Sequence, residues 1–167
     1  MIRATALALA LPAAALAGPA EDVAGCLAAS DAAFAAGAGG AFDIRWDGLR
    51  GIVADESACL NRAIAACAHA DGEAGCFPAL RGALSAQHAQ AMSGLPLTDE
   101  VEGRLAEPYA RWRDERDRSA GRPDGGAGHC PLHEPIRAEG CPVMAEAALL
   151  LRARDWARVF DLMETLE

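Results

Sequence analysis

The chain of 167 residues contains 24 Asp or Glu and 15 Arg but no Lys, which gives a formal net charge of −9. Such a surface repels nucleic acid and anionic lipid and speeds the association of basic proteins, so the composition argues against nucleic acid as a partner. A Ser-x-x-Lys nucleophile is also excluded, because the chain has no lysine.

Residues 1–17 have the pattern of a secretory signal peptide. Arg3 provides a positive start, the segment 4–16 carries no charge, and Ala15-Leu16-Ala17 is a small-x-small cleavage site. The apolar run is shorter than the roughly 20 residues that cross a bilayer, and no later segment predicts a membrane span. We therefore expect a periplasmic or secreted protein. Its single mature domain, 18–167, would have a net charge of 14 − 24 = −10 once Arg3 is removed.

Helical periodicity covers most of the mature chain. We expect a first helix over 19–36, followed by a short extended segment within 41–51, where apolar and charged residues alternate. Asp55 is the expected N-cap of a second helix, whose apolar residues repeat at helical spacing over 59–68.

Three more helices should follow. Pro78 fits the first turn of a third helix, and a longer fourth helix should begin at Thr98 and kink at Pro108. The Gly- and Pro-rich segment 119–140 predicts a long surface loop, after which Pro142 should begin the last helix. The predicted fold is all-α, a small bundle of about five helices cross-linked by disulfides.

Six cysteines follow the signal peptide, and an even number in an exported chain indicates disulfides. Cys59 and Cys67 lie on one helix about 12 Å apart, at about 1.5 Å per residue. That separation exceeds the roughly 4.4–6.8 Å between the Cα atoms of a disulfide, so each must pair with a cysteine off the helix. We predict the sequential pairs Cys26–Cys59, Cys67–Cys76 and Cys130–Cys141.

A metal site is the alternative to the third disulfide, because a short segment combines cysteines with histidines. Zinc or copper could be held there by His129, Cys130, His133 and Cys141. The spacing fits no standard zinc motif, and an exported chain meets an oxidising environment, so we expect no metal and no cofactor. The remaining histidines, His69 and His88, are expected to face solvent.

No catalytic motif is found in the chain. It contains neither G-x-S-x-G nor H-E-x-x-H, and the cysteines form a pairable set from which no nucleophile stands out. We therefore expect a protein that is not an enzyme. The charged stretch 109–117 is typical of a solvated helix face, and a partner-binding surface is the alternative interpretation.

Three local patterns combine into a family resemblance. Cys59 and Cys67 lie on an Ala-rich helix, and a Gly-containing turn separates them from Cys76. A Trp-x-x-x-Arg-Asp element is matched by Trp112, Arg116 and Asp117, and a Gly-rich loop leads to Cys141 and a final helix. In these features, which cover about 59–151, the chain resembles the lysozyme-inhibitor LprI-like family of exported bacterial proteins.

The chain would be a divergent member of that family. The family's cysteine three residues after Arg-Asp is Ala120 here, and its acidic, Trp-Asp and Leu-Asn pattern is absent from 77–92. The resemblance implies a helical, disulfide-bonded, extracytoplasmic domain that binds and inhibits a basic protein such as lysozyme. The alternatives are a periplasmic metal-binding protein that uses the 129–141 loop, and a structural accessory protein of the envelope.

Overall fold

The structure is a computed structural model that describes residues 18–37, 42–69, 75–120, 130, 132 and 136–164, with the backbone alone for 42–46 and 120. The predicted signal peptide therefore lies outside the described residues. Within them every regular element is helical, which confirms the predicted all-α class. The elements are α1 (Pro19–Gly37), α2 (Phe42–His69), α3 (Cys76–Ser93), η1 (Thr98–Glu100), η2 (Gly103–Leu105), α4 (Ala106–Ala120) and α5 (Arg137–Glu164).

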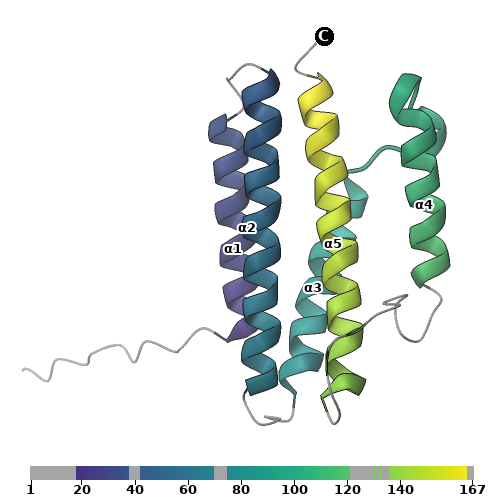
Figure 1. Cartoon of the computed structure of the whole chain (residues 1–167). Helices are drawn as coiled ribbons and strands as arrows, with labels where there is room; N and C mark the ends of the chain where they lie inside the picture. The colour runs from purple at the N-terminus through teal and green to yellow at the C-terminus, as the bar shows by residue number, and fades with distance from the viewer. Residues whose placement is uncertain are drawn as a thin grey trace, which may run out of the picture.

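The helices run alternately up and down, and four of them form the body of the molecule (Figure 1). α1, α2, α3 and α5 pack side by side, with α5 in contact with both α2 and α3. α4 stands outside this group, on the far side of α5 from α2 (Figure 1). None of the helices that the structure describes has an apolar stretch long enough to cross a membrane.

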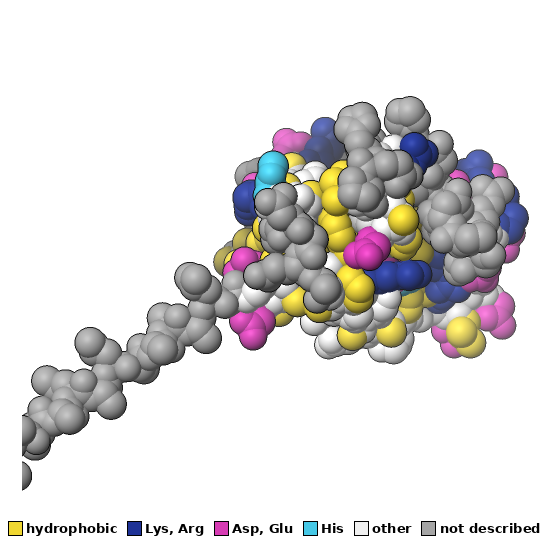
Figure 2. Space-filling view, turned by 90° about the horizontal axis from the view of Figure 1, so that it is seen from below, with side chains coloured by type: hydrophobic (Ala, Val, Ile, Leu, Met, Phe, Trp, Pro, Cys, Tyr) yellow, Lys and Arg dark blue, Asp and Glu magenta, His cyan; other side chains and the backbone are white. Residues whose placement is uncertain are grey.

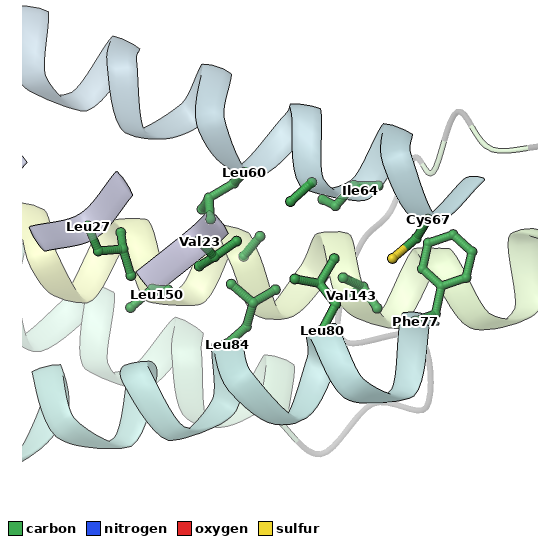
Figure 3. Packing of buried hydrophobic residues seen from close by; sticks show 12 residues of the cluster. Val23, Leu27, Leu60, Ile64, Cys67, Phe77, Leu80, Leu84, Val143 and Leu150 are labelled. Atoms are coloured by element: carbon green, nitrogen blue, oxygen red, sulfur yellow. The ribbon is translucent and has the colours of Figure 1, made fainter. Parts of the chain in front are cut away.

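One apolar core fills the space between the four packed helices (Figure 3). Each helix contributes residues at i, i+3 or i+4 spacing, which places them on one face. The buried members are Val23, Leu27, Leu60, Ala63, Ile64, Cys67, Phe77, Leu80, Leu84, Val143, Ala147 and Leu150. Burial of these side chains is the main force that holds the bundle together, because it removes apolar surface from water.

The start of α2 differs from the sequence prediction. The extended segment expected within 41–51 is wrong, because α2 begins at Phe42, and Asp55 lies within the helix instead of capping it. A lone extended segment would leave its backbone N–H and C=O groups without a partner strand, whereas a longer helix pairs them internally. Leu49 is buried four residues before Val53, so the helical face simply continues upstream.

The fourth helix is also shorter than predicted. Two 3-10 turns occupy 98–105, and the backbone between them is extended at Val101. Gly103 then has a φ of 68°, a left-handed conformation that favours glycine. α4 itself begins at Ala106, so Pro108 lies in its first turn, where proline needs no hydrogen-bond partner and causes no kink.

The surface loop predicted over 119–140 is too long at both ends. α4 continues to Ala120, and α5 begins at Arg137. Pro142 therefore lies inside the last helix instead of starting it. There proline removes one backbone hydrogen bond and its ring crowds the carbonyl of residue 138, in the second turn of a 28-residue helix.

The six cysteines form the three disulfides that the sequence predicts. Their Cα atoms are 6.4 Å apart in Cys26–Cys59, 5.5 Å in Cys67–Cys76 and 5.7 Å in Cys130–Cys141. The first links α1 to α2, the second links the end of α2 to the start of α3, and the third holds residue 130 against α5. The second and third lie at the end of the bundle where α3 and α5 begin, whereas Cys26 and Cys59 lie within their helices.

Candidate functional site

The predicted metal alternative loses half of its ligands in the structure. Cys130 and Cys141 are joined to each other, so their sulfurs are not thiolates while the disulfide is intact. His129 and His133 lie outside the described residues. Among the residues that the structure does describe, no cluster of His, Cys, Asp or Glu is arranged to hold a metal ion.

A buried charge network joins three helices and was not predicted. Glu56 of α2 is almost completely buried and accepts hydrogen bonds from two arginines of α5. Arg158 donates to both of its carboxylate oxygens, at 2.9 and 2.5 Å, and Arg154 donates to one of them at 3.0 and 2.7 Å. Asp31 of α1 completes the network, 2.6 Å from Nη2 of Arg154.

The arginines determine the charge state of Glu56. Burial alone would raise the pKa of its carboxyl, but hydrogen bonds from Arg158 and Arg154, together with their positive charges, outweigh that effect and lower the pKa. Arg154 also donates to the carbonyl oxygen of Leu27, at 3.3 Å. Glu56 is therefore a paired carboxylate that fixes helix positions, and both of its oxygens are already engaged.

The residue spacing of this network contains a signal that the sequence analysis missed. Glu56 lies four residues before Leu60, on the same apolar stripe of α2, and an acid in such a position indicates a buried, paired charge. Arg154 and Arg158 continue the stripe of Leu150 along α5 at i+4 and i+8. Their partner is about a hundred residues away in the chain, so spacing alone does not identify it.

The residues that match the family element separate into two environments. Trp112 joins an aromatic cluster that attaches α4 to α5, with its ring 5.5 Å from that of Tyr109 and 5.9 Å from that of Trp156. Arg116 and Asp117 instead form an ion pair with each other at the surface. Arg116 also donates to Sδ of Met92, 3.3 Å away, and so connects α4 to α3.

The connection between α3 and α4 is held rigidly by side chains of α4. The buried Tyr109 donates from its hydroxyl to the carbonyl oxygen of Pro96 at 2.7 Å, and Arg113 donates to the same oxygen at 2.8 Å. The backbone N–H of Leu97 donates to the carboxylate of Glu100, also at 2.7 Å. These bonds fix the path of the chain over 94–100. We call residues 94–102 the 94–102 loop.

That loop carries an exposed apolar side chain among acidic residues. Leu97 is 62% exposed, and among the described residues it is the large hydrophobic residue left open to solvent. Asp99, Glu100 and Glu102 are exposed close behind it in the chain. At the opposite end of the molecule, where α3 and α5 begin, acidic and basic side chains are interspersed (Figure 2).

His88 does not face solvent as predicted, whereas His69 is exposed. His88 lies between α3 and α5, where Nδ1 is 2.9 Å from Oε1 of Glu146. This hydrogen bond lowers the pKa of Glu146, although burial acts in the opposite direction. The pair therefore links α3 to α5, and Nε2 of His88 is buried without a hydrogen-bond partner among the described residues.

Comparison with known proteins adds no family to this description. No protein-family model, no curated protein and no solved structure matches the chain. The resemblance to the LprI-like family therefore stays a prediction, and the function has to be argued from the geometry of the described residues.

Proposed function

We propose that this protein is an exported, non-enzymatic binding domain that captures a basic protein through the 94–102 loop and the neighbouring face of α4. The observation that supports this most is Leu97, an exposed apolar side chain on a backbone that hydrogen bonds hold in place. The family resemblance makes lysozyme the first partner to test.

Rigidity is what distinguishes this loop from an ordinary connection. Ordering a flexible loop on binding costs free energy, so a loop that is already fixed loses less of its binding energy. Tyr109 and Arg113 fix the loop from α4 and leave Leu97 free to enter a pocket of the partner. An apolar side chain that fills such a pocket is the usual centre of a binding surface.

Charge favours a basic partner. The mature chain would carry a net charge of −10, and Asp99, Glu100 and Glu102 concentrate negative charge beside Leu97. Complementary charge speeds the encounter of two proteins and is screened by salt, whereas apolar contacts are far less sensitive to it. The proposal therefore predicts tight binding at low ionic strength through a strongly salt-dependent association rate.

The test measures binding and inhibition of a chicken-type lysozyme by the oxidised mature domain, from about 0.02 M to about 0.5 M salt, a range over which screening becomes strong. We expect the association rate to fall steeply with salt. Leu97→Ala should weaken binding about tenfold, as expected for an apolar residue at the centre of an interface.

A matched pair of variants separates the loop from the overall charge. The first double variant is Asp99→Asn with Glu102→Gln, and the second is Asp47→Asn with Asp55→Asn. Each removes two negative charges, and all four residues are exposed. The first double variant should weaken binding clearly more than the second. If both act equally, the loop is not the binding surface, and absence of binding at any salt would overturn the lysozyme proposal itself.

A further inference from the structure

A groove runs between α4 and the four-helix body, on the side of α5 that the core does not use. It has a volume of about 530 Å³ and lies where α2 and α4 begin (Figure 1). Three helices and the second 3-10 turn contribute its lining: Leu49, Arg50, Val53, Leu105, Pro108, Arg152, Asp155, Trp156 and Val159. A cavity of this size is typical of sites for small organic molecules, which occupy roughly 300–1,000 Å³.

The walls of the groove are mainly apolar. Val53 and Leu49 form one side on α2, Pro108 forms the opposite side on α4, and Trp156 lies between them on α5. The ring of Trp156 is fixed by the edge-on ring of Tyr109, 5.0 Å away, so this wall is preformed. An apolar molecule would gain by covering these side chains, because they are left partly open to water.

Two exposed arginines lie at the rim of the groove. Arg50 of α2 and Arg152 of α5 make no ion pair with any residue that the structure describes, although the charge of Arg152 acts on Asp155. The two guanidinium groups offer paired donors that suit a carboxylate or a sulfonate.

Asp155 adds a third polar feature to the wall. Its Oδ1 is buried and has no hydrogen-bond partner among the described residues. Burial raises the pKa of this carboxyl, against the effect of Arg152 and Arg158 nearby. Because Oδ1 is closed to solvent, a ligand in the groove would lie beside Asp155 without bonding to that atom.

We propose that the groove binds a small amphipathic acid. The acid group pairs with Arg50 and Arg152 at the rim. The apolar body covers the wall formed by Val53 and Trp156. This site is separate from the 94–102 loop, and neither proposal depends on the other.

The first measurement titrates the oxidised domain with 1-anilinonaphthalene-8-sulfonate, which combines a sulfonate, two aromatic systems and an N–H donor. We expect saturable fluorescence with one probe bound per protein. Decanoate, an apolar chain with one carboxylate, should displace the probe. Decyltrimethylammonium, with the same chain length and a positive charge, should not compete.

Variants then locate the site. Arg50→Gln and Arg152→Gln should each weaken probe binding about fivefold or more through loss of a charged donor. Val53→Trp should abolish it by filling the groove. Arg62→Gln is the matched control, since Arg62 is an exposed arginine of α2 away from the groove. Circular dichroism verifies that each variant is folded.

Three results would overturn the proposal. The first is equal probe binding in Arg62→Gln, Arg50→Gln and Arg152→Gln, which would mean that the rim arginines do not recognise the anion. The second is displacement by the cation as effectively as by decanoate, which would make Asp155 the main determinant and reverse the ligand's charge. The third is unchanged binding in folded Val53→Trp, which would place the probe elsewhere.

Discussion

Two regions of the helical bundle are held together by different chemistry. At the end where α3 and α5 begin, the side chains in contact are apolar, and the disulfides Cys67–Cys76 and Cys130–Cys141 lie beside them. Farther from that end, at the middle of α2, Glu56 is shared by Arg154 and Arg158. Beside it, Tyr109, Trp156 and Phe160 connect α4 to α5 through ring contacts.

Because disulfides stabilise one region and buried charges stabilise the other, the two regions respond to different conditions. A covalent bond acts mainly by restricting the unfolded chain, and it is broken by reductants but not by pH or salt. A buried carboxylate with two arginines depends on its charge and on its geometry, so removal of any one member leaves the others unpaired. Reduction should therefore destabilise the disulfide-linked region. Acidification or a neutralising mutation should destabilise the region around Glu56.

The largest effect is expected for Glu56→Gln. The amide cannot balance two guanidinium groups, and breaking a buried pair in this way costs about 3–5 kcal/mol of folding free energy. Urea unfolding followed by circular dichroism measures this loss. Asp47→Asn, at an exposed acid of the same helix, is the control and should change stability little.

Acid should remove the same contribution in the unmodified protein. Because the pKa of Glu56 is lowered in the folded state, its stabilisation is present above the unfolded pKa near 4.5 and is lost as the pH falls through the folded value. The difference in stability between the unmodified protein and Glu56→Gln should shrink over that range. A difference that stays constant to strongly acidic pH would mean that the carboxylate charge does not contribute.

The next largest effect is expected for removal of the disulfide between α1 and α2. Loop-entropy arithmetic gives about 3.7 kcal/mol for the 33-residue separation of Cys26 and Cys59, against about 2.6 kcal/mol for the 9-residue separation of Cys67 and Cys76. Paired serine substitutions in each, compared by urea unfolding, test the order. The reverse order would indicate that strain or packing around Cys67 outweighs chain entropy.

Gly140→Ala should have a smaller effect and probes the packing of the disulfide-linked end. A Cβ atom there would collide with Leu132 and lie 3.3 Å from the ring of Phe77. Overpacking of this kind costs about 1–3 kcal/mol. Gly82→Ala on α3 is the control, because a Cβ there meets nothing within 4 Å and alanine favours helix by roughly 0.5–1 kcal/mol. Equal thermal stability of the two variants would contradict the crowding.

The smallest effect, and one of opposite sign, is expected for Asp155→Asn. Burial raises the pKa of Asp155, so any stability that this group contributes is present below the unfolded pKa of 3.8 and is lost as the pH rises through the folded value. Asparagine avoids that loss and should raise the melting temperature at neutral pH but not at acidic pH. A lower melting temperature at neutral pH would show that the arginines outweigh the burial.

The disulfide-linked end was predictable from local spacing. Cys59 and Cys67 cannot reach each other along one helix, so each must pair with a cysteine outside that helix. The apolar residues around them repeat with the helical period, so the spacing of Leu60 and Ile64 already predicts which face is buried.

The region around Glu56 was not predictable in the same way, because Glu56 and its arginine partners are distant in sequence. In the sequence alone, Arg154 and Arg158 look like exposed residues of an ordinary surface helix. Only the packing of α2 against α5 shows that they pair with Glu56. The 3-10 turns before α4 depend similarly on the tertiary hydrogen bonds of Tyr109 and Arg113. Propensity does not encode such contacts, which is why a longer helix from Thr98 was expected.

The place of α5 in the chain also has a consequence for the timing of folding. This helix is synthesised after α1, α2 and α3, yet it supplies Val143 and Leu150 to the core and both arginines that neutralise Glu56. Until α5 leaves the ribosome, the apolar faces of α1, α2 and α3 have no complete partner, and Glu56 has no cation to bind. The three earlier helices should therefore not complete their packing until α5 has been synthesised.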